Sequence, residues 1–226
     1  MTKKIAPGVY RLSVGGVGAF LLDDDGAVTV VDTGLPGNVD EIWGGLKTIG
    51  RSPKDVKNIL VTHYHQDHIG CLAPLTQGTD ATVYAPAGEA AFIRSGGMAP
   101  PLKSRGFLGA VLSRFLKMSE QPPNKVDEEV DDGDTLPIAG GIQVVGTKGH
   151  SVGHVAYLWP QHGGVLFPGD AAMTFLGKVR AMPIAEDFDG ADRSFARLAG
   201  LDFAAAGFAH GAPIRSRAAA RFRSAL

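Results

Sequence analysis

The chain has 226 residues, of which 44% are hydrophobic, and this length suits one domain with a sizeable core. Its 22 basic and 23 acidic residues leave a formal net charge of −1, which excludes a long-range electrostatic pull toward nucleic acid or an anionic membrane. The single cysteine, Cys71, excludes an intrachain disulfide. We therefore expect a single domain over residues 1–226 that acts on a small-molecule substrate, with no nucleic-acid or membrane partner, as a monomer or a homodimer.

The N-terminal segment lacks the pattern of a signal peptide. After the charged start Met1–Lys4, the apolar stretch is interrupted by Pro7, Arg11 and several glycines, and no small-residue cleavage pattern follows. No run approaches the roughly 18 apolar residues of a membrane span. The expected location is the cytoplasm.

Strand-like and helical segments alternate in the first third of the chain. Two short strand-like runs lie between residues 8 and 22, and the β-branched run 27–32 predicts a strand buried on both faces. Apolar side chains then recur at helical spacing after Asn38, a candidate helix cap with Glu41 at the capping-box position. A further buried strand, 56–62, ends at a cluster of histidines. This order predicts an α/β fold with functional residues at strand ends.

Residues 94–125 differ from the rest of the chain, because glycine and proline pairs open the stretch and a proline pair closes it. Between them, apolar side chains recur in a wide helical stripe at Phe107, Leu108, Val111, Leu112, Phe115 and Leu116. The stripe predicts a helical insertion. This insertion either packs on a core of its own or forms a lid or a dimer contact over the functional site.

The second half of the chain again combines strands and helices. Residues 143–146, 155–159 and 165–167 are predicted strands, and 191–198 and 215–225 are predicted helices. The complete pattern predicts several strands in each half of an α/β fold, with helices outside.

Six of the seven histidines are grouped in short motifs. These groups are His63, His65 and His68 together with Asp67, then His150 and His154, and finally His210. Scattered histidines are usually ordinary surface or hydrogen-bonded residues, but three histidines and an aspartate within six positions are not what scatter produces. Because neutral imidazole is a common ligand of zinc and other first-row metals, the pattern indicates a metal site.

The spacing within the first group suggests how metal ions would be held. In an extended segment, side chains two positions apart point to the same side, so His63 and His65 can bind one ion together. Asp67 and His68 follow where the chain must turn, and they can face a second ion. Two ions roughly 3.5–4 Å apart stabilise the attacking and leaving oxygens of a hydrolysis, and Asp170, at a strand end, is the candidate bridging acid.

Two simpler explanations of the cluster fit the sequence less well. Histidines that only cap strands would be costly to bury without partners. A purely structural zinc site is usually closed by four ligands and is often rich in cysteine, whereas this chain has a surplus of histidine and aspartate. A catalytic metal centre is therefore the favoured interpretation.

Five motifs, spread over nearly the whole chain, together resemble those of the metallo-β-lactamase superfamily. They are, in order, Val31-Asp32-Thr33-Gly34, the run 62–68, Gly149-His150-Ser151, Gly169-Asp170 and His210-Gly211. The resemblance implies an αββα four-layer sandwich, in which two mixed β-sheets pack face to face with helices outside. It also implies metal ions in a cleft at one edge of the sheets.

The resemblance implies a role for each candidate ligand. His63, His65 and His150 would hold one divalent ion, Asp67, His68 and His210 a second, and Asp170 would bridge the two. Asp32 would orient a ligand histidine through a hydrogen bond, and His154 would support the ligands. Zn²⁺ is the expected ion, with Mn, Fe and Co as alternatives, because histidine and aspartate suit several metals.

Two positions distinguish branches of the superfamily. The best-known zinc β-lactamases have a cysteine where this chain has Asp170, so the chain is more similar to the glyoxalase II, lactonase and esterase-like members. Lys148 stands where a proline often precedes the Gly-His pair, and it either alters the loop or places a cation near the substrate.

The function predicted from these features is metal-dependent hydrolysis. A metal-bridging hydroxide would attack the carbonyl carbon of an ester, lactone or thioester, with Asp67 and Asp170 as catalytic carboxylates. The alternatives are a mononuclear iron dioxygenase of sulfur compounds, a phosphodiesterase or nuclease, and a non-enzymatic interaction protein. The neutral charge argues against the nuclease, and the intact ligand set argues against the interaction protein. Metal counting separates the dioxygenase from the hydrolase.

Overall fold

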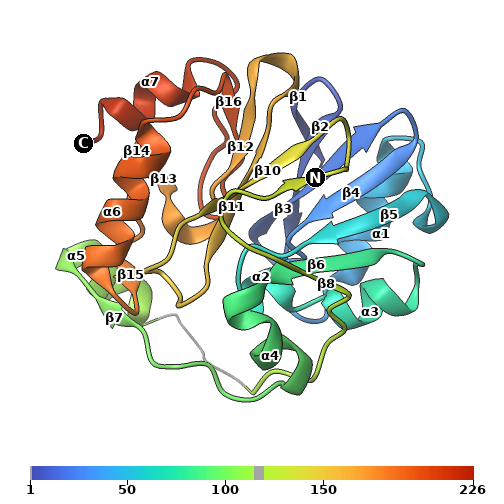
Figure 1. Ribbon diagram of the computed structural model, residues 1–226, viewed down its shortest axis with the longest axis horizontal. Coiled ribbons are helices and arrows are strands. Elements are labelled where there is room, and N and C mark those ends of the chain that lie inside the picture. The colour runs from blue at the N-terminus through green and yellow to red at the C-terminus, as the bar shows by residue number, and fades with distance from the viewer. Residues whose placement is uncertain (1, 115–119) are drawn as a thin grey trace.

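The computed structural model describes residues 2–114 and 120–226, and two β-sheets packed face to face form its centre (Figure 1). The first sheet has seven strands in the order β1-β2-β3-β4-β5-β6-β8. It is antiparallel from the first strand to the fourth and parallel from there on. Its strands are β1 (Lys3–Ala6), β2 (Val9–Val14), β3 (Val17–Asp24), β4 (Ala27–Val31), β5 (Val56–Leu60), β6 (Thr82–Pro86) and β8 (Glu128–Val130).

The second sheet has five strands in the order β16-β12-β11-β10-β9. Its one parallel pair joins the last two strands in chain order. Predicted strands 155–159 and 165–167 have the same bounds in the structure. The strands are β9 (Thr135–Leu136), β10 (Ile142–Gly146), β11 (Val155–Trp159), β12 (Val165–Phe167) and β16 (Ala205–Ala206).

Alternation of side chains along the strands separates the core into layers. In β3, Phe20 and Leu22 enter the core between the two sheets, whereas Leu21 faces the helices that cover the first sheet. In β12, Phe167 faces the first sheet, and Leu166 faces the helices on the opposite side. A strand with apolar residues on both faces is buried on both, which is why these runs lack polar alternation.

Helices cover both outer faces (Figure 1). On the first sheet lie α1 (Val39–Thr48), α3 (Leu72–Gln77) and α4 (Ala87–Ser95), and on the second lie α6 (Phe188–Ala199) and α7 (Ala218–Arg223). The predicted αββα sandwich is therefore confirmed. Short helical turns are α2 (Gln66–Ile69), η1 (Pro53–Asp55), η2 (Gln161–Gly163) and η3 (Gly169–Ala171).

The segment 94–125 docks on the second half of the chain. It contains β7 (Lys103–Ser104) and α5 (Gly106–Ser113), and β7 pairs with β15 (Ile184–Ala185) in a two-stranded ribbon. A second ribbon joins β13 (Met173–Phe175) to β14 (Lys178–Arg180).

The predicted apolar stripe of this segment packs only in part. Leu112 contacts the buried cluster formed by Met173, Met182 and Ile184, but Phe107 is 87% exposed. Phe115 and Leu116, also assigned to the stripe, lie outside the described residues.

One local prediction is wrong. The Asn38 side chain does not cap α1 but donates hydrogen bonds to the carbonyls of Leu35 and Pro36. Glu41 does not close a capping box, because its carboxylate accepts from the Gly15 N–H at 2.7 Å. Glu41 thus connects α1 to the turn between β2 and β3.

No helix within the described residues has the length and apolar character needed to cross a membrane.

Candidate metal centre

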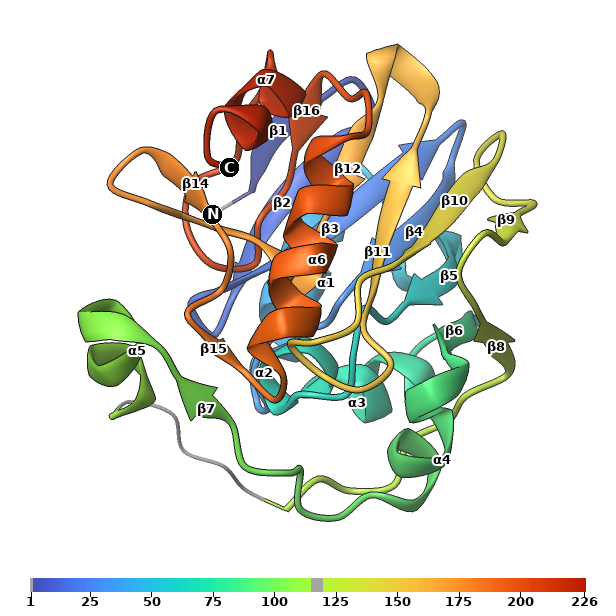
Figure 2. The same ribbon diagram turned by 60° about the vertical axis from the view of Figure 1, so that its left-hand side comes forward.

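The predicted site residues lie in loops and short helical turns at one edge of the sandwich. Asp32 follows β4 and His63 follows β5, and these two strands are parallel neighbours. Asp170 follows β12 and His210 follows β16, which are parallel neighbours in the other sheet. Because parallel strands have their carboxyl ends at the same edge, both sheets deliver side chains to one place. Figure 2 shows α2, β7, β15 and α4 gathered at this lower end of the molecule.

A cluster of three histidines forms one part of the site. His63, His65 and His150 offer ligand atoms that all lie within 4.8 Å of one another, and the three side chains are buried. His65 Nδ1 and His150 Nε2 are 2.9 Å apart. Burial lowers the pKa of His63 well below its ordinary value and that of His65 to about 3, so these rings are neutral, as metal binding requires.

The protein fixes the ring orientation of two of these histidines through the nitrogen that points away from the cluster. His150 Nδ1 donates to the Ile184 carbonyl at 2.8 Å, and His63 Nδ1 lies 3.0 Å from the Thr62 hydroxyl. Ile184 begins β15, so the strand on which segment 94–125 docks also orients a ligand candidate. Such outer contacts select the tautomer that leaves Nε2 free to bind a metal.

Four further residues form the second cluster. The ligand atoms of Asp67, His68, Asp170 and His210 also lie within 4.8 Å of one another. His210 Nε2 is 3.1 Å from an Asp67 carboxylate oxygen, and the side chains of these two residues are 31% and 23% exposed. This cluster is therefore the part of the centre that is open to solvent.

Asp170 lies between the two clusters. Its Oδ1 is 3.4 Å from both His68 Nε2 and His210 Nε2, whereas its Oδ2 is 3.3 Å from His150 Nε2. One carboxylate oxygen thus faces each cluster. The structure brings together all seven residues that the sequence suggests as ligands, in the two groups that the resemblance implies.

Asp32 supports the second cluster from behind. Its carboxylate accepts hydrogen bonds from His68 Nδ1 at 2.8 Å and from the Thr62 N–H at 2.8 Å. Asp32 has a left-handed backbone with φ of 55°, an uncommon conformation that these contacts hold in place. Although burial opposes it, the carboxylates of Asp170 and Asp32 raise the pKa of His68. Because Nδ1 of His68 faces Asp32, its Nε2 faces Asp170.

His154 belongs to neither cluster. Its Nδ1 lies 2.8 Å from the Thr147 hydroxyl, and its Nε2 accepts a hydrogen bond from the Asp170 N–H at 3.0 Å. Gly169 makes this contact possible, because its φ is +52° and a Cβ there would lie 2.7 Å from His154 Nε2. Both ring nitrogens of His154 are thus engaged, one with the Thr147 hydroxyl and one with the backbone of Asp170.

The buried atoms of the centre fit divalent metal ions. His63 Nε2, His68 Nε2 and Asp170 Oδ1 are buried and have no hydrogen-bond partner. Leaving such atoms unpaired is costly, and a cation beside them would remove that cost. Imidazole nitrogens combined with carboxylate oxygens are the donor set that Zn²⁺ and neighbouring first-row metals accept.

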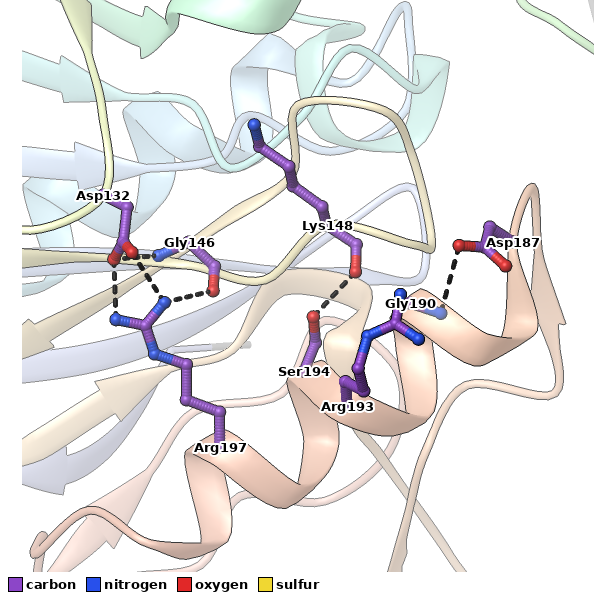
Figure 3. Close-up of a pocket in the computed structure, with 8 residues that line it drawn as sticks. All are labelled: Asp132, Gly146, Lys148, Asp187, Gly190, Arg193, Ser194 and Arg197. Atoms are coloured by element: carbon purple, nitrogen blue, oxygen red, sulfur yellow. Dashed lines mark hydrogen bonds and ion pairs between the residues drawn. The ribbon is translucent and has the colours of Figure 1, made fainter.

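The loop that carries His150 is fixed against α6 (Figure 3). The Ser194 hydroxyl donates to the Lys148 carbonyl at 2.7 Å, and the Asp187 N–H donates to the Gly149 carbonyl at 2.9 Å. Lys148 is exposed and borders a pocket of about 440 Å³ that Arg193 and Arg197 of α6 also line. The carbonyl of Lys148 thus faces α6, whereas its side chain extends away from that helix (Figure 3).

The sequence did not identify two carboxylates that touch the centre's loops. Glu186 accepts a hydrogen bond from the Tyr64 hydroxyl. Glu89 is buried in the first turn of α4 and accepts the Tyr64 N–H. Both residues are far in sequence from the motifs, and a single glutamate in a helix or loop gives no signal that would distinguish it.

Comparison with known proteins agrees with this geometry. A model of the metallo-beta-lactamase superfamily matches residues 12–210. The chain is 27% identical to the probable metallo-hydrolase YflN of Bacillus subtilis, over 98% of this chain and 89% of that protein. It is 32% identical to a hydroxyacylglutathione hydrolase of Methylobacillus flagellatus, over 67% of this chain but only 45% of that protein. The chain thus spans about half the length of the latter relative.

Solved structures show the same architecture. A beta-lactamase from Chitinophaga pinensis superposes with a TM-score of 0.70 and 25% identity, over 92% of this chain and 77% of that chain. The MIM-2 metallo-beta-lactamase superposes with a TM-score of 0.72 and 23% identity, over 98% of this chain and 80% of that chain. The family match covers most of the chain and includes every ligand candidate. The chain therefore belongs to the metallo-β-lactamase superfamily, and its class is that of the metal-dependent hydrolases.

Proposed function

We propose that the protein is a dinuclear metallohydrolase that cleaves the ester, lactone or thioester bond of a small molecule. The observation that carries the proposal is the position of Asp170, which presents one carboxylate oxygen to each of two adjacent ligand clusters. A mononuclear site needs only one of these clusters. The second cluster, with two carboxylates and two imidazoles, would then be costly to bury and would have no function.

Each of the two clusters would hold one metal ion. His63, His65 and His150 would hold the first, Asp67, His68 and His210 the second, and Asp170 would contact both. When bound there, divalent ions polarise a carbonyl oxygen and lower the pKa of water toward neutrality. Zn²⁺ is the ion we expect.

The open side of the centre indicates where chemistry takes place. Asp67 and His210 are its partly exposed members, so a substrate reaches the centre past these two side chains. The Asp67 carboxylate is placed to orient an attacking water and to accept its proton. The buried imidazoles of the other cluster keep water away from the opposite side.

Two observations support an acyl substrate. Relatives from several bacteria are named hydroxyacylglutathione hydrolase, and the name denotes hydrolysis of an acyl compound. In addition, the bridging position holds an aspartate, Asp170, which makes the chain similar to the glyoxalase II, lactonase and esterase-like branch.

Metal analysis of the purified protein, together with a panel of esters, lactones, thioesters and β-lactams, tests this proposal. We expect two metal ions per chain and hydrolysis of at least one ester, lactone or thioester, lost on chelation and restored by metal. His63→Ala should abolish both activity and binding at the three-histidine cluster. His162→Ala is the matched control, because His162 is exposed and outside both clusters.

Three results would overturn the proposal. One iron per chain with oxygen uptake on a persulfide would establish the dioxygenase alternative. Cleavage of phosphodiesters, with no hydrolysis in the acyl panel, would establish the nuclease alternative. Full hydrolytic activity in metal-free His63→Ala protein would exclude a metal mechanism.

A further inference from the structure

A buried carboxylate outside both ligand clusters connects two loops of the metal centre. Glu89 belongs to the first turn of α4 and is 1% exposed. Its Oε2 accepts a hydrogen bond from the Tyr64 N–H at 2.6 Å. Tyr64 lies between His63 and His65, so this contact fixes the backbone that carries two of the three histidines.

The other oxygen of Glu89 binds the loop of the third histidine. Glu89 Oε1 accepts hydrogen bonds from the Ser151 hydroxyl and from the Gly153 N–H, the latter at 2.9 Å. Ser151 directly follows His150. A single carboxylate therefore links, through three donors, the two segments that together supply His63, His65 and His150.

The His150 loop packs closely against Glu89 and the start of α4. A Cβ on Gly153 would lie 2.7 Å from Glu89 Cγ and 3.0 Å from the backbone carbon of Gly88. Only a glycine allows the loop to approach the start of α4 so closely.

The second cluster depends on different supports. Asp32 orients His68, and His154 holds the backbone of Asp170. The strand end before His210 is held by Arg11, which donates to the carbonyls of Phe208 and Ala209 at 3.2 and 3.3 Å. The hydrogen bonds of Glu89 described above go to Tyr64, between His63 and His65, and to residues just after His150, and none of them goes to Asp67, His68, Asp170 or His210.

We propose that Glu89 is the positioning residue of the three-histidine cluster, setting the distance between the His63–His65 segment and the His150 loop. The inference rests on the metal centre proposed above, but not on the identity of the substrate. Outer contacts of this kind commonly change metal affinity by about 10- to 100-fold.

Glu89→Gln tests the proposal with little change in shape. The amide keeps one acceptor oxygen but presents an NH₂ group where the other oxygen stood, so one of the two loops loses its acceptor. Glu129→Gln is the matched control, since Glu129 of β8 pairs with Arg94 of α4, the helix that carries Glu89, and these two side chains are 44% and 43% exposed.

Cobalt binding can be measured at each cluster separately. Metal-free protein is titrated with Co²⁺ against a chelator, and the visible absorption of the bound ion is followed. In a His210→Ala background, which leaves the three-histidine cluster intact, we expect Glu89→Gln to weaken binding by about 10- to 100-fold. In a His63→Ala background, which leaves the second cluster intact, the same change should stay within about twofold, as should Glu129→Gln in both.

Each failure has a distinct meaning. If the unsubstituted protein binds no cobalt, the proposed metal centre is wrong. If it binds two ions and Glu89→Gln leaves both affinities unchanged, only the role of Glu89 is wrong, even where thermal unfolding of the metal-free protein shows a loss of stability. Equal weakening of both clusters would also overturn the inference.

A milder variant covers the case in which Glu89→Gln does not fold. Ser151→Ala removes one donor and leaves the Glu89 carboxylate and its two N–H contacts in place. We expect a weakening of a few-fold at the three-histidine cluster alone, below the range for a complete outer contact. Unchanged cobalt affinity in folded Ser151→Ala protein would contradict the proposal.

Discussion

The two ligand clusters of the centre are built on different principles. The three-histidine cluster is buried, contains only imidazoles, and is fixed by Glu89, Ile184 and Thr62. The second cluster combines two imidazoles with two carboxylates and is partly exposed at Asp67 and His210. One half of the centre is thus enclosed and rigidly supported, while the other half is open to the surroundings.

This difference suggests that the two clusters have different roles in the metal centre. A neutral, buried set of imidazoles gives an ion a fixed position, because burial keeps the rings unprotonated and outer contacts hold them. The carboxylates of the open set bring the negative charge that stabilises a second cation, and its exposure admits substrate and water. Asp170 faces both clusters, so its loss should affect metal binding at both of them.

Asp170→Ala should have the largest effect. The substitution removes the one carboxylate that faces both clusters, so we expect hydrolysis to fall by at least about 1,000-fold, the scale for loss of a preorganised electrostatic contact. Metal analysis should show fewer than two ions per chain. Asp202→Ala, at a 95% exposed side chain, is the control. Retention of two ions and of activity in Asp170→Ala would remove the basis for a shared ligand.

Asp32→Ala should weaken the second cluster more than the three-histidine cluster. Loss of its hydrogen bond to His68 should weaken metal binding at the second cluster by about 10- to 100-fold, because the ring is no longer oriented. The Thr62 N–H would also lose its acceptor, which costs about 1–3 kcal/mol of unfolding free energy. Cobalt titration and thermal unfolding measure the two effects. The Thr62 hydroxyl, which lies beside His63 Nδ1, also donates to Asp32, so a smaller loss is expected at the three-histidine cluster, and equal weakening of both clusters would contradict the prediction.

Tyr64→Phe should change stability and not metal binding. Tyr64 lies between two ligand candidates, but its hydroxyl contacts Glu186 and not the cluster. A hydrogen bond to a charged group contributes about 1.5–3 kcal/mol, so we expect a loss near the lower end of that range in denaturant unfolding. A metal content below that of the unsubstituted protein would place the phenol in the centre after all.

Asp192→Asn should have the smallest effect, at the contact between segment 94–125 and α6. Arg105 pairs with Asp192 at 2.7 Å, but both side chains are about half exposed, so the pair contributes at most about 1 kcal/mol. Its hydrogen bond to Arg105 lowers the pKa of Asp192 below the ordinary 3.8. The stabilisation is therefore complete above pH 3.8 and is lost as the pH falls through the lowered pKa. Denaturant unfolding at pH 7 should show the difference, and unfolding at low pH should not.

Local patterns in the sequence predicted an α/β fold and a metal site at the histidine motifs, whereas the sandwich and the division of the ligands into two groups were implied by the resemblance to the metallo-β-lactamase superfamily. Strands buried on both faces appear as uninterrupted apolar runs, as in β11 and β12, and ligand histidines appear as dense motifs. The contacts of Glu41 and Glu89 could not be predicted in this way. Each contact is made with a residue that is distant in sequence, Gly15 for Glu41 and Ser151 for Glu89. Residue spacing along the chain does not predict such contacts.

Segment 94–125 shows the same limit in packing. Its apolar composition predicted a helix, and α5 is present, but composition does not say which of its side chains find a neighbour. Phe107 remains exposed, whereas Leu112 is covered by the cluster around Ile184.

Activity measured against the number of bound metal ions tests the central claim most directly. Metal-free protein would be titrated with Zn²⁺ while hydrolysis of the best substrate and bound metal per chain are followed together. Two clusters that share Asp170 predict that activity stays low at one ion per chain and reaches its maximum at two. Full activity at one ion per chain, unchanged by the second, would contradict the dinuclear account.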